Sequence, residues 1–186
     1  EFHNGMGAAL RSRGDITASI KHYQNAVNLN PNFMTAYNNL GVALKETGDK
    51  DAALQIYKRA LEIQPDNADT HFYMGVFLQE TEEIDEALES YKEALQIDPK
   101  YAAAYFNIGN MLESKGELNA AMNNYKKALE VQPNYAMAIS NLVYLMNLYG
   151  YLSSQERFFE SCSCAQALEA PFVSEVPNFT NSRDPD

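Results

Sequence analysis

The sequence predicts an all-α protein, built as a solenoid of stacked helix-turn-helix units. The first observation is an internal repeat, because four residue types recur every 34 residues. They are the glycines Gly7, Gly41, Gly75 and Gly109, the tyrosines Tyr23, Tyr57, Tyr91 and Tyr125, the alanines Ala26, Ala60, Ala94 and Ala128, and the prolines Pro31, Pro65, Pro99 and Pro133. The second observation is that apolar residues between these anchors follow helical spacing. A period of this length is typical of stacked repeats, because one short unit cannot bury its own apolar face.

The first helix of the second unit is predicted over residues 34–47. Tyr37, Leu40 and Leu44 lie at helical spacing and form one apolar face. Gly48 then interrupts the pattern and favours a turn.

The second helix of this unit carries Ala53, Tyr57 and Ala60 on one apolar stripe. Asp49 precedes it and is expected to cap it, because a side-chain oxygen can accept from the free N–H groups of the first turn. The proline after this helix ends it. Asp66, which follows that proline, is expected to cap the first helix of the next unit.

Gly41 occupies the middle of a predicted helix, where glycine costs about 1 kcal/mol relative to alanine. Its recurrence in four copies indicates a compensating contact. We expect that Gly41, with Ala53 and Ala60, lets the two helices approach closely, and that Tyr57 fills the space beside them.

The pattern aromatic-x2-Leu-Gly-x2-Leu, followed by Ala-x3-Tyr-x2-Ala and a proline, resembles the tetratricopeptide repeat (TPR) family over residues 1–135. The resemblance implies a right-handed TPR α-solenoid whose first helices line a concave groove for extended peptides. Four positions depart from the family pattern: Ser19 replaces alanine, His3 and His71 replace an aromatic residue, and Glu82 stands where the other units have glycine.

The repeat register divides the chain into a solenoid over residues 1–169 and a tail over residues 170–186. The expected units are 1–33, 34–67, 68–101, 102–135 and a degenerate fifth at 136–169, where Val143 replaces the glycine. Residues 136–148 are apolar on almost every side, so this helix should be buried all round. Residues 153–169 are predicted to form a C-terminal capping helix over it. The polar tail contains three prolines and is expected to be extended or disordered.

The net charge of −11 argues against a nucleic acid or an anionic membrane as partner, because both require a cationic surface. No apolar run approaches the ~18 residues of a membrane span, and the start has no signal-peptide pattern. We therefore expect a cytoplasmic or nuclear protein. Cys162 and Cys164 are expected to be reduced thiols, and without a nearby histidine they do not complete a zinc site. No nucleophile–base pair or phosphate loop is present, so we expect no enzyme activity, metal or cofactor.

The chain begins abruptly at Glu1, already inside the first unit and without an initiator methionine. This start indicates a fragment of a longer repeat array. An uncovered first unit would expose an apolar face, so self-association through this N-terminal repeat is a further expectation.

Four rows of first-helix residues are expected to face the groove, by the register of the family. The rows are Asn39, Tyr73, Asn107 and Asn141; Asn4, Asn38, Phe72, Phe106 and Ser140; Ala8, Val42, Val76 and Asn110; and Arg11, Lys45, Gln79 and Glu113. An asparagine amide both donates and accepts, so it can pair with the backbone of any extended peptide, at about 1 kcal/mol net for each bond. The alternative is that the asparagines are solvated helix residues. The two phenylalanines are candidates for packing as well as for apolar anchors.

Two functions from different classes remain open on the sequence alone. The first is a protein-interaction scaffold that binds an extended peptide or a partner helix in the concave groove. The second is the substrate-recognition arm of an O-glycosyltransferase whose catalytic domain is absent from this chain. It rests on residues 36–49 and the asparagine row, interrupted by Tyr73, which resemble the arm of O-linked N-acetylglucosamine transferase and SPINDLY-like proteins. Residues 140–159 also resemble the junction after the last repeat in those proteins.

Overall fold

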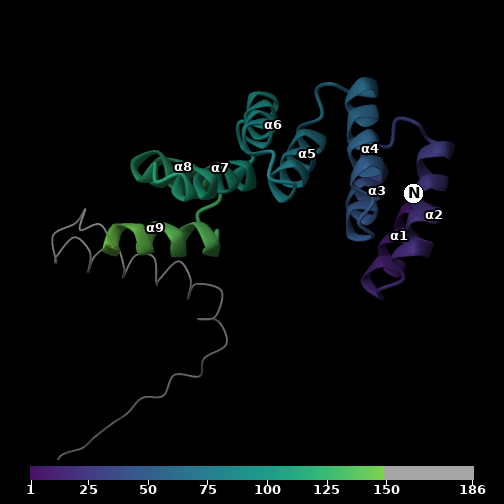
Figure 1. Ribbon diagram of the computed structural model, residues 1–186, viewed down its shortest axis with the longest axis horizontal. Coiled ribbons are helices and arrows are strands. Elements are labelled where there is room, and N and C mark those ends of the chain that lie inside the picture. Colours follow the sequence, from purple (N-terminus) through teal and green to yellow (C-terminus); the bar gives the residue numbers. More distant parts are fainter. Residues whose placement is uncertain (149–186) are drawn as a thin grey trace, which may run out of the picture.

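The computed structural model describes residues 1–148, which fold into helices without any strand in that range. The helices are α1 (Phe2–Ser12), α2 (Ile16–Leu29), α3 (Met34–Glu46), α4 (Lys50–Ile63), α5 (Ala68–Glu80), α6 (Ile84–Ile97), α7 (Ala102–Ser114), α8 (Leu118–Val131) and α9 (Ala136–Leu148). They follow one another along an arch (Figure 1). The predicted all-α class is therefore confirmed.

The helices pack as successive antiparallel pairs. Each repeat pairs its first and second helix, as α1 with α2, α3 with α4, α5 with α6, and α7 with α8, and each second helix then contacts the first helix of the next repeat. First helices also contact each other directly, α1 with α3 and α3 with α5. This arrangement is a helix-turn-helix solenoid, in which α1, α3, α5 and α7 lie toward the inside of the arch (Figure 1). We call the first helices α1, α3, α5, α7 and α9 the inner row.

The recurring tyrosines and glycines form the centre of each repeat. Tyr57 is 1% exposed, and a Cβ atom added to Gly41 would lie 2.5 Å from its ring. The other three copies repeat this contact at 2.5 to 2.7 Å. The predicted close approach at Gly41 is confirmed, and the group that requires it is the tyrosine ring itself.

Capping follows the expected chemistry at one of the two predicted positions. Asp49 caps α4, because its side chain accepts from the backbone N–H of Ala52 at 3.1 Å. The prediction for Asp66 is wrong, since Asn67 caps α5 and accepts from the backbone N–H of Thr70 at 2.9 Å. Helix α5 begins at Ala68, one residue later than the position of Pro65 suggested. The side chain that lies three residues before the free N–H group of Thr70 is therefore that of Asn67.

Glu82 occupies the turn that glycine occupies in the other three regular repeats. Its φ is 66°, in the left-handed region, beside values of 78° to 85° at the equivalent glycines. The turn geometry is therefore kept although the residue has changed, at a conformational cost of roughly 1–2 kcal/mol.

Helix α9 packs one face against α8, and the prediction that it is buried all round stays a prediction, because residues 153–169 were expected to cover its other face. Ala138, Leu142 and Leu145 are buried, whereas Met137 and Tyr144 are 54% and 57% exposed. These three buried residues of α9 pack in one cluster with Tyr125 of α8. The predicted capping helix at 153–169 and the tail at 170–186 lie outside the described residues.

Candidate functional site

The predicted groove residues lie on the inner row of helices α1, α3, α5, α7 and α9. Most of them are half-buried, so part of each side chain remains accessible. The half-buried members from the predicted set are Asn39, Val42, Lys45, Phe72, Tyr73, Val76, Gln79, Asn107, Asn110 and Asn141.

Two predicted groove residues belong to the core in this conformation. Asn38 is 4% exposed, and its buried Oδ1 has no hydrogen-bond partner within residues 1–148. Phe106 is 8% exposed and packs against Tyr125 and Tyr135, with ring centroids 5.8 and 5.1 Å apart. Both side chains fill space between helices, so we leave them out of the proposed contact surface.

Phe72 has the same register as Asn38 and Phe106 but keeps part of its surface accessible. Its ring stacks on Tyr101 with centroids 4.8 Å apart, and it also lies 5.7 Å from the Tyr91 ring. Packing therefore accounts for much of this side chain, as one of the two sequence-based alternatives proposed.

The asparagine row links neighbouring repeats through its amide nitrogens. Asn39 donates to Asn4 Oδ1 at 2.9 Å, and Asn107 donates to the Tyr91 hydroxyl at 3.1 Å. Asn141 donates to the Tyr125 hydroxyl at 3.3 Å and to the side-chain oxygen of Asn110 at 2.9 Å. In residues 1–148, no side chain or backbone group donates to the Oδ1 atoms of these three row members.

The fourth predicted row forms ion pairs with neighbouring repeats or hydrogen bonds with the core tyrosines. Its members are Arg11, Lys45, Gln79 and Glu113. Arg11 forms a two-pronged ion pair with Glu46, at 2.7 Å for the closest atoms, and Lys45 pairs with Glu80 at 2.8 Å. The guanidinium of Arg11 also holds the pKa of the Glu46 carboxyl below its usual range.

The later members of the same row accept from the buried tyrosines instead. The Tyr91 hydroxyl donates to Gln79 Oε1 at 2.9 Å, and the Tyr125 hydroxyl donates to Glu113 Oε2 at 2.6 Å. Burial raises the pKa of both tyrosines well above their ordinary value, so each hydroxyl keeps its proton and remains a donor.

A cavity of about 370 Å³ lies on the inner side, between the first and second repeats. Its lining residues are Ala8, Arg11, Ser12, Tyr23, Asn39 and Glu46. Ala8, Arg11 and Asn39 belong to the predicted rows, so part of this cavity is lined by residues that were expected to face the groove. The Tyr23 hydroxyl is buried here and has no hydrogen-bond partner in the described part of the chain.

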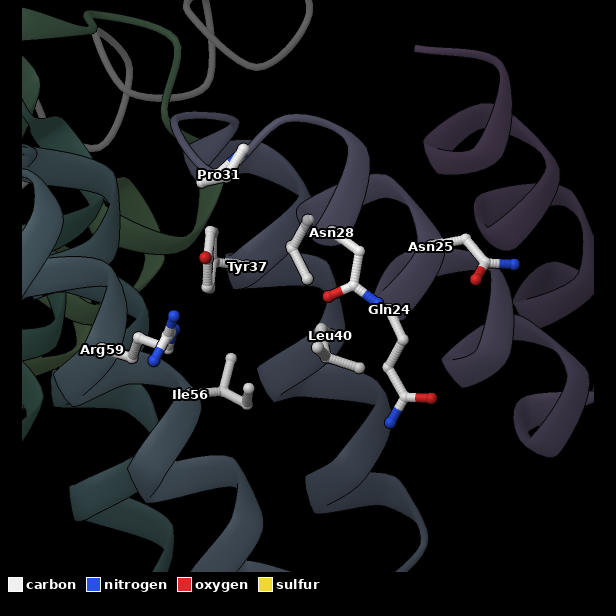
Figure 2. A pocket seen from close by; sticks show the side chains of 9 residues that line it. Gln24, Asn25, Asn28, Pro31, Tyr37, Leu40, Ile56 and Arg59 are labelled. Carbon is white, nitrogen blue, oxygen red and sulfur yellow. The ribbon is translucent and has the colours of Figure 1, made fainter.

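A second cavity, of about 470 Å³, was not anticipated from the sequence (Figure 2). It lies between α2, α3 and α4 and is lined by Gln24, Asn25, Val27, Asn28, Pro31, Tyr37, Leu40, Ile56 and Arg59. Figure 2 shows Leu40 and Ile56 in its middle, with polar side chains around them. Most lining residues come from second helices, which the family register does not assign to a binding surface. The feature of the sequence that could have indicated this cavity is the set of three side-chain amides on α2, Gln24, Asn25 and Asn28.

The described residues offer little to a metal ion. Within residues 1–148, no group of three or more His, Cys, Asp and Glu side chains is close enough to hold one. His3 and His22 approach each other with their Nδ1 atoms 3.1 Å apart and share a hydrogen bond. No helix in the described range has the length and apolar character needed to cross a membrane.

Comparison with solved structures shows the fold. A structure titled "Crystal structure of MamA protein" superposes with a TM-score of 0.71 at 20% identity, covering 95% of each chain. MamA residues 41 to the end from Desulfovibrio magneticus RS-1 gives 0.67 at 15% identity, covering 94% of this chain and 96% of that one. Pseudomonas aeruginosa PilF gives 0.77 at 20% identity, covering 89% of this chain and 74% of that one. No curated protein sequence gives a significant match.

Family models match the sequence along the regular repeats. A model described as "TPR repeat" matches residues 7–48 and 78–116, and two described as "Tetratricopeptide repeat" match residues 35–67 and 102–135, and residues 56–89. These matches run without a gap from residue 7 to residue 135, over the repeats whose glycines contact the buried tyrosines. The chain therefore belongs to the tetratricopeptide repeat family.

Proposed function

We propose that this chain is a protein-interaction scaffold that binds an extended peptide along its inner row of helices. The contact surface consists of the half-buried residues of that row: Asn39, Val42, Lys45, Phe72, Tyr73, Val76, Gln79, Asn107, Asn110 and Asn141. Val42 and Val76 lie on the same surface as the amides, so it can take both the side chains and the backbone of a peptide.

The observation that carries this proposal is how the asparagine amides are used. The amide nitrogens of Asn39, Asn107 and Asn141 each donate a hydrogen bond inside the protein. No described residue donates to their side-chain oxygens. The internal bond fixes each side chain, so its oxygen is held in place before a ligand arrives. Acceptors at intervals of whole repeats suit the backbone N–H groups of an extended peptide.

The experiment compares two sets of substitutions against a random-peptide display library. The first variant is Asn39→Ala, Asn107→Ala, Asn141→Ala, and the matched control is Gln24→Ala, Asn25→Ala, Asn28→Ala on α2. Circular dichroism first establishes that both variants keep the helical content of the parent chain. We expect peptides selected on the parent to lose binding to the inner-row variant and to retain it on the control. The reverse pattern would move the site to the cavity in Figure 2.

A partner helix is the other ligand that the inner row could take. The same selected peptides distinguish the two cases, because a helical ligand gains helical circular dichroism on binding and an extended peptide does not. We favour the extended peptide, because the free oxygens need backbone N–H groups that a helix has already used.

Two other hypotheses from the sequence have less support. The substrate-recognition arm of an O-glycosyltransferase rests on the sequence resemblance alone, since the comparisons above involve TPR models, MamA and PilF. Self-association through the first repeat is favoured by Phe2 and Met6, which are 72% and 39% exposed. Light scattering over a dilution series tests it, and a constant monomer mass would contradict it.

A further inference from the structure

Charge changes along the inner row from one end to the other. The fourth predicted row of residues on these helices begins with Arg11 and Lys45 in the first two repeats. Glu46 and Glu80 form ion pairs with them and offset their charges. The third repeat has the neutral Gln79, and the fourth has the carboxylate of Glu113. The same structural position therefore passes from cationic through neutral to anionic.

The register explains why the ion pairs of the first two repeats do not recur at Glu113 within residues 1–148. Each of the first two ion pairs joins a row residue to the residue 35 positions later, on the next first helix. The residue 35 positions after Glu113 is Leu148, which is apolar. Within residues 1–148, no lysine, arginine or histidine forms an ion pair with Glu113.

The Glu113 carboxylate receives one hydrogen bond from the described residues, and the donor of that bond is shared. The Tyr125 hydroxyl lies 2.6 Å from Glu113 Oε2 and 2.8 Å from Asn110 Oδ1, but it has a single proton to give. The Asn141 amide nitrogen is directed at the side-chain oxygen of Asn110 and at the same hydroxyl, not at the carboxylate. Within residues 1–148, no side chain or backbone group donates to Glu113 Oε1, so this half-buried carboxylate can still accept from a ligand.

We propose that Glu113 and Asn110 form a subsite that binds the lysine or arginine side chain of a peptide lying on the inner row. This inference rests on the proposed function. It adds the chemical class of one ligand side chain and the place of that side chain along the inner row. An ammonium group brings three donors and a guanidinium five, and either can donate to the Glu113 oxygen that accepts no bond from the described residues. A half-buried ion pair is also screened less than one on an open surface. The basic residue of the ligand lies at the end of the groove nearest α7 and α9.

The variant that tests the subsite is Glu113→Gln, for which the chain contains its own precedent. Gln79 already occupies the equivalent position and accepts from Tyr91 as Glu113 accepts from Tyr125. The substitution therefore keeps the buried hydrogen bond and removes only the charge. The matched control is Glu130→Gln, which removes the same charge from an exposed residue of the second helix α8.

The experiment selects peptides from a random display library on the parent chain and on both variants. We expect peptides from the parent and from Glu130→Gln to be enriched in a lysine or arginine at one position, and this enrichment to disappear on Glu113→Gln. A selected peptide should bind Glu113→Gln about tenfold more weakly, whereas a version with methionine in place of its basic residue should bind both chains equally.

The outcomes separate this inference from the function on which it rests. One outcome is that the selected peptides need the three asparagines but show no difference in basic enrichment between the parent and Glu113→Gln, or show no basic enrichment at all. This outcome would overturn the subsite and leave the scaffold function in place. Equal losses in Glu113→Gln and Glu130→Gln would assign the preference to overall charge and would also overturn it. Failure to select any peptide that depends on the inner row would overturn both proposals.

Discussion

The Asn107 side chain donates a hydrogen bond to the hydroxyl of Tyr91, 3.1 Å away in the preceding repeat. That hydroxyl in turn donates to Gln79. A residue on the proposed binding surface is therefore also part of the interface between repeats. Substitutions on the inner row must be judged for stability before they are judged for binding.

The link between Asn107 and Tyr91 should be measurable as a coupling energy. Tyr91→Phe is expected to lower the free energy of unfolding by about 1 kcal/mol, because the hydroxyl makes two hydrogen bonds at a buried position. In a double-mutant cycle with Asn107→Ala, followed by urea denaturation, we expect a coupling of roughly 0.5–1.5 kcal/mol. Tyr105→Phe serves as control, because no described residue hydrogen-bonds to its hydroxyl. Additive effects of Tyr91→Phe and Asn107→Ala would contradict the link.

The contact between Gly41 and Tyr57 should make alanine destabilising at a helical position where it is normally favoured. Gly41→Ala places a methyl group 2.5 Å from a ring that is 1% exposed, so we expect a loss of roughly 1–3 kcal/mol. Gly5→Ala is the matched control, because its Cβ meets no atom within 4 Å, and it should gain up to about 1 kcal/mol from helix propensity. Chemical denaturation measures both, and a stabilising Gly41→Ala would show that the ring can move aside.

Glu82 offers a stabilising substitution. Its φ of 66° is costly for a residue with a side chain, so Glu82→Gly should raise the free energy of unfolding by about 1 kcal/mol. Gln55→Gly, in the exposed interior of α4, should instead lower it by about 1 kcal/mol. If both substitutions destabilised the chain equally, the turn at Glu82 would not have the strained backbone described above.

Stability should fall in alkaline solution because of the core tyrosines. Burial raises the pKa of Tyr57, Tyr91 and Tyr125 above the ordinary value of about 10. The folded state then holds protons that the unfolded state loses, so this contribution is complete below about pH 10 and declines as the pH rises further. Ultraviolet titration should show the core tyrosines ionising together with the loss of helical circular dichroism. Ionisation of all tyrosines near pH 10 with full helicity would contradict it.

The sequence predicted the fold well because the information lies in spacing. The 34-residue period located the glycine contact with Tyr57 and the Asp49 cap, since both depend on residues close together in the chain. It was less successful where exposure depends on the neighbouring repeat. Asn38, Phe72 and Phe106 share one register position, yet Asn38 and Phe106 are buried whereas Phe72 is half-buried. Periodicity fixes which row a residue belongs to, but the size of the side chains packed against it decides whether it is reached by solvent.

The candidate site also holds contacts that were not predicted from the sequence. The links from the asparagines to the tyrosine hydroxyls depend on side-chain geometry across a repeat boundary, and the cavity in Figure 2 arises between second helices. The sequence therefore supplied the candidate residues of the inner row. The structure supplied the reason why Asn39, Asn107 and Asn141 would act through their oxygens.

The most direct test of the central proposal is to locate a bound peptide on the chain. A peptide selected on the parent chain, carrying one photoreactive residue at successive positions, would be crosslinked and the adducts mapped by mass spectrometry. The proposal predicts adducts on α3, α5 and α7, at or beside Val42, Val76 and Asn110, in an order that follows the peptide sequence. Adducts concentrated on α2 and α4, around Asn28 and Arg59, would contradict it and assign binding to the other cavity.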